Sequence, residues 1–235
     1  MKRILIFLVL LATQSYGQTI RGVYIHTHLK SMSSDANGVT KNPIEPETFS
    51  FSYSDQKSLY EMISSQKSKI DTSHIFHKGV KLETYNAVTL ANVDVTYKNL
   101  KNNQIIKEYN IRNSNFSAKD KLPDYKWTIT NETAVINGYK CKKATTKKAF
   151  VPTTAWFTEE IPINDGPFEF WDLPGLIIKV ELGGYTDITL ETITITSENS
   201  EIKEPQNKST QVTLDNFNSS IEAYLEGTSP VNKYK

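Results

Sequence analysis

The sequence contains a single cysteine, Cys141, among its 235 residues. One cysteine cannot form an intramolecular disulfide, so the fold must be stabilised by its core alone. Free cysteine is among the most frequently buried residue types, and we expect Cys141 to be buried. A catalytic thiol is the alternative, but no sequence feature places a histidine beside it.

Long apolar runs are also scarce. The one such run, residues 4–12, is too short to span a bilayer. It follows a positively charged head and precedes small residues, the pattern of a secretory signal peptide over residues 1–17. We therefore expect a protein that does not span the membrane and that resides in the periplasm or at the cell surface after cleavage.

The chain has almost no net charge. Removing Lys2 and Arg3 with the signal peptide changes the formal net charge from +1 to −1. This balance gives no electrostatic reason to expect nucleic acid or an anionic membrane as a partner. The chain also lacks a nucleophile elbow, a phosphate loop, a dinucleotide fingerprint and an HExxH motif. The sequence therefore indicates no cofactor and favours a non-enzymatic role.

Alternation with a period of two dominates the rest of the chain and predicts strands. Apolar residues alternate over 49–53 and return over 59–63, which predicts a hairpin with one aromatic face. Asn137-Gly138 is the strongest short hairpin signal. The apolar parity changes near Glu191, which predicts a β-bulge.

Only the C-terminal region has helical spacing, with Thr213 or Asp215 as the predicted cap and Gly227 as the stop. The predicted fold is mainly β: one curved, mostly antiparallel sheet, open or half-barrel, with a C-terminal helix packed on it. Residues 18–235 are expected to form one β-rich domain with a mobile loop near 30–46 and a loose C-terminal tail.

The stretch GPFEFWDLPGLIIKVE combines two chain reversals with three aromatic residues. Gly166-Pro167 forces a turn, and Leu173 is pushed to an extended conformation by Pro174. Gly175 is free to adopt positive φ. The aromatic residues between these reversals are predicted to pack against the sheet, so the stretch is interpreted as structural.

LPGLI at Leu173–Ile177 resembles the signature of the GLPGLI family, exported proteins of Bacteroidota with no established activity. GYKCKKA (Gly138–Ala144), AWFTEEIPI (Ala155–Ile163) and the stretch Gly166–Glu181 resemble that family's blocks in order and spacing. The signature's first glycine is Asp172 here, and Asp is one of the few residues that tolerate positive φ. The resemblance implies an exported location but no mechanism. The matching positions, predicted to be structural or ligand-binding, are Gly138, Tyr139, Cys141, Trp156, Glu160, Pro162, Gly166, Pro167, Leu173, Pro174, Gly175, Leu176 and Ile177.

Two other groups of residues could carry chemistry. His26 and His28 share one face of a strand and are a weak candidate for a metal pair, with exposed histidines as the alternative. Since no recognised closed site is formed, even with His74, His77 or Cys141 as further ligands, no metal is predicted.

An acidic group surrounds the turn-rich stretch. Paired carboxylates can hydrolyse glycosides, but a solvated rim partly paired with nearby lysines is favoured. The acids are Glu159, Glu160, Asp165, Glu169 and Asp172. The lysines are Lys140, Lys142, Lys143, Lys147 and Lys148.

The sequence favours an exported, non-enzymatic protein that binds an apolar or peptide ligand on a concave, aromatic sheet face. The first alternative is an interaction module that serves an outer-membrane transport or secretion assembly through an exposed sheet edge. The second is a metal-handling protein that uses the histidines. The expected partner is therefore an apolar or peptide ligand or an envelope protein.

Overall fold

The structure is a computed structural model. It describes residues 18–29, 34–35, 38–39, 45–63, 69–77, 80–88, 91–111, 114–149, 151–198, 200–206 and 211–227. The predicted signal peptide, most of the predicted loop near 30–46 and the tail beyond Gly227 lie outside these residues.

Fifteen strands and one helix are described, and each predicted element has a counterpart among them. The strands are β1 (Thr19–His28), β2 (Ser34–Asp35), β3 (Gly38–Val39), β4 (Glu47–Ser54), β5 (Lys57–Met62), β6 (Lys69–His77), β7 (Val80–Val88), β8 (Ala91–Asn99), β9 (Gln104–Ile111), β10 (Ser114–Asp120), β11 (Thr128–Ile136), β12 (Tyr139–Thr146), β13 (Thr153–Thr158), β14 (Leu176–Leu182) and β15 (Thr186–Thr196). The helix is α1 (Leu214–Gly227).

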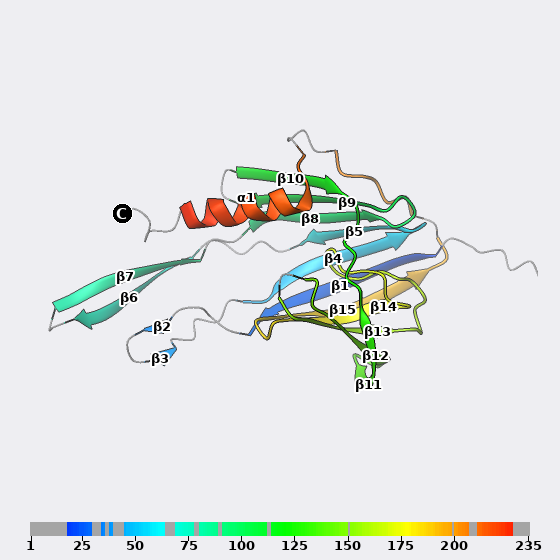
Figure 1. The fold of residues 1–235 in the computed structure, drawn as a ribbon, viewed down its shortest axis with the longest axis horizontal. Coiled ribbons are helices and arrows are strands. Elements are labelled where there is room, and N and C mark those ends of the chain that lie inside the picture. Colours follow the sequence, from blue (N-terminus) through cyan, green and yellow to red (C-terminus); the bar gives the residue numbers. More distant parts are fainter. Residues whose placement is uncertain are drawn as a thin grey trace, which may run out of the picture.

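Eleven strands form one antiparallel sheet that does not close into a barrel (Figure 1). Their order is β10-β9-β8-β5-β4-β1-β15-β14-β13-β12-β11, so β10 and β11 are the edges. The pairs β2-β3 and β6-β7 are separate two-stranded sheets. The predicted mainly β fold with an open antiparallel sheet and a C-terminal helix is confirmed. No helix of the described residues is long and apolar enough to cross a membrane.

Two local predictions about the strands are confirmed. Asn137 and Gly138 have φ values of 48° and 86° and form the tight turn between β11 and β12. Both residues must adopt positive φ in this turn, which Asn and Gly do most readily. Val23 of β1 pairs with Thr192 of β15, and the next residue, Tyr24, pairs with Leu190. Glu191 of β15 is therefore left out of the pairing and forms the predicted bulge.

Helix α1 packs against β10, and Figure 1 shows it running roughly along the direction of strands β8 to β10 at this edge of the sheet. The hydroxyl of Thr213 accepts a hydrogen bond from the N–H of Asn216, so Thr213 is the cap. Asp120 of β10 accepts a second bond from the N–H of Leu214 at 3.0 Å. Phe217 is buried, and Tyr224 packs edge to face on a ring of β10.

Large aromatic side chains fill the core on one face of the sheet. Tyr24, Phe49 and Tyr60 are at most 1% exposed. The rings of Phe49 and Tyr60 are stacked with centroids 4.9 Å apart, and the hydroxyl of Tyr24 donates to the carbonyl of Ile177 at 2.7 Å. Stacked aromatics bury much surface for each residue and give the core its stability in the absence of a disulfide.

A segment that we call the clasp, residues 159–175, runs from β13 to β14 across this aromatic face (Figure 1). An ion pair between Lys98 of β8 and Asp165 of the clasp is completely buried. The same ammonium group donates to the carbonyls of Gly166 at 2.8 Å and Phe170 at 3.1 Å. The ring of Phe168 then packs on Tyr60, with centroids 4.9 Å apart.

Backbone conformation in the clasp agrees with its sequence. Gly175 has a φ of 155°, and a Cβ there would lie 2.0 Å from the carbonyl oxygen of Thr158. Asp172, at the position where the resembled signature has its first glycine, has a φ of 69°. An aspartate therefore adopts positive φ at this turn, as the sequence predicts. The indole N–H of Trp171 donates to the carbonyl of Pro123 at 2.7 Å, which fastens the clasp to the segment before β11.

We expect Gly175→Ala to lower the free energy of unfolding by about 2 kcal/mol or more, because the new methyl group meets backbone atoms that cannot rotate away. Chemical denaturation measures this change. The matched control is Gly184→Ala, where φ is also positive but nothing lies within 4 Å of the added carbon. An equal cost in the two variants would reject the close backbone approach at Gly175.

We expect Lys98→Met to cost about 3–5 kcal/mol of stability, because it leaves the buried carboxylate of Asp165 without its counter-charge. The control is Lys142→Met, which breaks an exposed ion pair with Glu159 and should cost less than about 1 kcal/mol. Denaturation curves with similar midpoints for both variants would show that the buried pair does not hold the clasp.

Candidate functional site

The family-motif residues lie in two places. Those within and just after the clasp are mostly buried, including Gly166, Pro167, Leu173, Leu176 and Ile177. These residues lie where the clasp meets the sheet.

A second group, Gly138, Tyr139, Cys141 and Glu160, gathers at the hairpin of β11 and β12, at the edge of the sheet. Trp156 is half-buried on β13, and Pro162 is exposed in the clasp.

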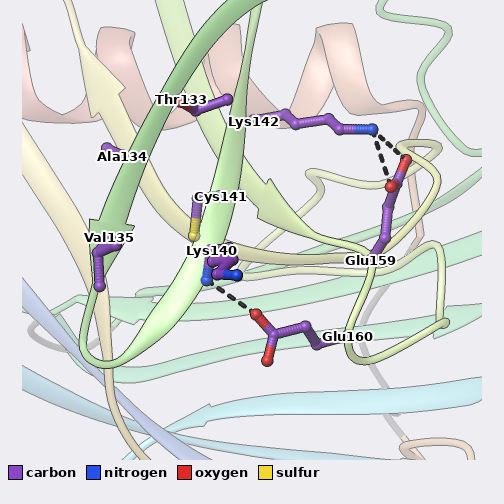
Figure 2. Close-up of a pocket in the computed structure, with 8 residues that line it drawn as sticks. All are labelled: Thr133, Ala134, Val135, Lys140, Cys141, Lys142, Glu159 and Glu160. Atoms are coloured by element: carbon purple, nitrogen blue, oxygen red, sulfur yellow. Dashed lines mark hydrogen bonds and ion pairs between the residues drawn. The ribbon is translucent and has the colours of Figure 1, made fainter.

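A surface hollow of about 720 Å³ lies at this edge. Figure 2 shows that its lining residues come from the facing strands of the hairpin and from the turn that follows β13. They are Thr133, Ala134, Val135, Lys140, Cys141, Lys142, Glu159 and Glu160.

Strand β11 forms one side of the hollow and, among the residues that the structure describes, has a strand neighbour on the β12 side only. Most of its side chains are exposed, with Val135 72% and Ile129 48% accessible. The register shifts between Ile129 and Thr133, and regular pairing then continues from Thr133 to Ile136. The regular, open part of the edge is therefore the short stretch directly beside the hollow.

Charged groups around the hollow are mostly neutralised within the protein. Lys142 forms an ion pair with both carboxylate oxygens of Glu159, at 2.8 and 2.9 Å (Figure 2). Lys143 contacts Glu132 of β11 at 3.0 Å. Glu160 accepts a hydrogen bond from the backbone N–H of Lys140 at 2.9 Å, where β12 extends beyond the end of β13.

Cys141 is buried, as the sequence predicts. Burial raises the pKa of its thiol to about 11, with Glu160 adding to the rise and a backbone hydrogen bond at Ile136 opposing it. The thiol donates to the carbonyl of Tyr139 at 3.5 Å. A thiol that stays protonated at neutral pH is a poor nucleophile, so Cys141 acts here as a small apolar side chain.

The two histidines of β1 share a face, as strand geometry predicts, but they have different surroundings. His26 is buried, with Nε2 2.5 Å from the hydroxyl of Tyr60, and burial together with His28 lowers its pKa to about 3. His28 lies 3.5 Å from Glu47. Among the described residues, no three His, Cys, Asp or Glu side chains are placed to hold a metal ion. His74 and His77 belong to β6, in the separate β6-β7 pair.

The predicted acidic rim is correct only in part. Glu159, Glu160 and Asp172 are exposed. Asp165 is completely buried and pairs with Lys98, and Glu169 pairs with Lys107 of β9 at 2.8 Å. For these two acids the rim prediction is wrong, because their partners come from strands far away in the sequence and not from the neighbouring lysines.

The pair of Lys107 and Glu169 belongs to a second polar group, on the aromatic face. The ammonium of Lys107 lies between two rings, 5.6 Å from the centroid of Phe168 and 5.7 Å from that of Phe217. Burial raises the pKa of Glu169, but the charge and hydrogen bond of Lys107, a backbone hydrogen bond and the charge of Lys98 together outweigh burial and keep this pKa below its ordinary value. Asp94 of β8 lies in the field of the same groups.

Asp94 has the most displaced acid pKa of this group. Burial raises it to about 7; Lys107 opposes the rise, while Glu169 and Glu47 add to it. Asp94 could not be identified from the sequence, because it alternates with Val93 and Val95 as it would on a solvent-exposed face.

A second surface hollow, of about 660 Å³, lies at the turn between β14 and β15. Leu29 and Tyr185 are half exposed there. Its acids Glu181 and Asp187 are both paired with Lys179. It lies between turns, whereas the first hollow lies beside the edge strand.

Comparison with known proteins supports the fold and leaves the activity open. A family model described as a protein of unknown function (Porph_ging) matches residues 147–179, which include β13 and the clasp. No curated protein matches the chain.

Two solved structures of PNGF-II are similar to this chain. The structure in space group P21 has a TM-score of 0.54 and 16% identity, and the one in space group C2 has 0.51 and 17%. Each match covers 87% of this chain and 33% of the other, so this chain spans about a third of the length of PNGF-II. At this identity the likeness establishes a shared fold.

We expect Asp94→Asn to stabilise the protein more at pH 8 than at pH 5. The pKa of Asp94 is raised in the folded state, so wild-type stability falls as pH rises from the ordinary aspartate value towards 7. Asn cannot ionise and avoids this loss, a gain of at least about 1 kcal/mol at pH 8 relative to pH 5. Urea denaturation at the two pH values measures the difference. A pH-independent effect of the substitution would contradict the raised pKa.

Proposed function

We propose that this is an exported, non-enzymatic protein of the GLPGLI type, located in the periplasm or at the cell surface. It binds an extended segment of an envelope protein, which adds as a strand to β11 and places side chains at the neighbouring hollow. The observation that carries the proposal is the position of the hollow beside the short, regular and open part of the sheet edge.

The edge favours an extended ligand because of its backbone. A strand that pairs on one side only presents unpaired N–H and C=O groups on the other, and a ligand in the β conformation satisfies them. Natural edges are protected by lysine, proline or bulges. The irregular pairing between Ile129 and Thr133 protects the first half of β11, whereas residues 133–136 contain neither lysine nor proline.

The other edge of the sheet differs in this respect. Strand β10 is covered by α1 and also contacts Val212, whose N–H donates to the carbonyl of Ser117 at 3.1 Å. The C-terminal region thus covers the β10 edge, whereas no described strand pairs with the free side of β11, which is where the partner adds. A partner strand from an envelope assembly is both the peptide ligand of the first hypothesis and the protein partner of the interaction-module hypothesis, and both bind at the same surface.

Chemistry at the hollow supports binding over catalysis. The thiol of Cys141 is protonated at neutral pH, and Glu159 is held in an ion pair by Lys142. The row of Ala134 and Cys141, on the opposite face of β11 and β12 from Val135 and Lys140, contains only small or apolar side chains. Because successive residues of a strand point to opposite faces, this row suits an apolar side chain at one of two alternating positions of a bound strand.

We expect Val135→Lys to abolish capture of the partner, because a lysine on an edge strand opposes pairing with another strand. Protein purified from its own envelope fraction would be analysed by native mass spectrometry, with a denatured sample to identify ligand mass. The wild-type protein should carry a polypeptide that Val135→Lys lacks.

The control is Ile195→Lys, an exposed apolar position on β15, away from the hollow. This variant should retain the bound polypeptide. Equal loss in both variants, or a bound lipid in place of a polypeptide, would contradict strand addition at β11.

A further inference from the structure

We propose that the ligand strand carries a carboxylate that pairs with Lys140, in the row of side chains that crosses Val135. This inference rests on the proposed function and specifies the chemistry of the partner at the same site. A carboxylate can come from an acidic side chain or from a free C-terminus, and the experiment below separates these two sources.

The lysines of the hairpin differ in whether their charge is neutralised within the protein. Three lysines of β12 lie at or beside the hollow, and two of them are neutralised within the protein: Lys142 by Glu159 and Lys143 by Glu132. Lys140 is exposed, and its ammonium group forms no ion pair with any residue that the structure describes. The carboxylate of Glu160 contacts the backbone N–H of Lys140 and not its side chain.

The position of Lys140 in the sheet aligns it with the edge strand. Lys140 is the direct cross-strand partner of Val135, so the two side chains lie on the same face in one row. A ligand strand added to β11 places one of its residues next to Val135 in the same row. That residue lies two strand spacings, about 10 Å, from β12.

The side chain of Lys140 is long enough to reach towards a ligand strand. Val135 is short and 72% exposed, so it does not block the space above it. The flexible four-carbon stem of Lys140 can extend over Val135, and a carboxylate on the ligand can meet it from the other side. The neighbouring row contains Thr133 and Lys142, whose charge is already taken by Glu159. One position of the ligand is therefore selected for a carboxylate and the next one is not.

The test uses immobilised full-length protein and a synthetic library of heptapeptides with Thr, Val or Ile at six positions and Glu, Gln or Lys at the centre. The peptides are acetylated and amidated, and a further set has central Gln and a free C-terminal carboxylate. Mass spectrometry measures the enrichment of each set on wild type, Lys140→Gln, Lys142→Gln and Val135→Lys.

We expect wild type to enrich a carboxylate-bearing set over the amidated Gln set by about two- to fivefold, the size typical of an exposed ion pair. The preference should vanish in Lys140→Gln, persist in the matched control Lys142→Gln and weaken as salt concentration rises. Enrichment of the central-Glu set identifies an acidic side chain as the source, and enrichment of the free-acid set identifies a C-terminus.

Two outcomes would reject the proposals separately. Equal enrichment of Glu and Gln peptides, with loss of both in Val135→Lys, would leave strand addition intact and overturn the role of Lys140. No enrichment of any set over Val135→Lys would overturn the proposed function itself.

Discussion

A buried ion pair between Lys98 and Asp165 connects strand β8 of the sheet to the clasp. Removing both charges from water is costly, and further hydrogen bonds help to offset the cost: the ammonium donates to the carbonyls of Gly166 and Phe170, and the N–H of Gly166 donates to Oδ1 of Asp165 at 2.8 Å. Among the described residues, Oδ2 of Asp165 has no hydrogen-bond partner, so its stability depends on the charge of Lys98. The clasp cannot shift across the aromatic face without leaving at least one charge buried and unpaired.

The hollow beside β11 is linked to this ion pair by the backbone of the clasp. The clasp is closed at its base by two hydrogen bonds, from Leu176 to the carbonyl of Ile161 at 3.0 Å and from Ile177 to that of Asp165 at 2.9 Å. Glu159 and Glu160, which form one wall of the hollow, stand at the first turn of the same segment. The ion pair on β8, near the β10 edge of the sheet, therefore holds the same segment that forms one wall of the hollow at the β11 edge.

Much of the fold could be predicted from the sequence because its signals are local. Asn137-Gly138 specifies a tight turn by the φ angles that it tolerates, and the change of apolar parity near Glu191 records a bulge in the strand itself. The spacing of Phe217 and its neighbours, with Thr213 as cap, is a property of one helix. The hollow could not be predicted in this way, because β11, β12 and the turn after β13 meet there only once the strand order is known.

Strand β8 shows where prediction from neighbouring residues in the sequence fails. Asp94, Thr96 and Lys98 alternate with Val93, Val95 and Tyr97, a pattern typical of one solvated and one buried face. In the fold Lys98 and Tyr97 are both buried, since the clasp covers the polar face and other parts of the chain cover the opposite one. The sequence by itself determined the strands, their turns and the helix, because hydrogen bonding and side-chain alternation act between near neighbours. Only the tertiary structure decided which charges are buried, which sheet edge lacks a second strand neighbour among the described residues and which lysine of the hairpin has no described ion pair, because those depend on contacts between residues far apart in the chain.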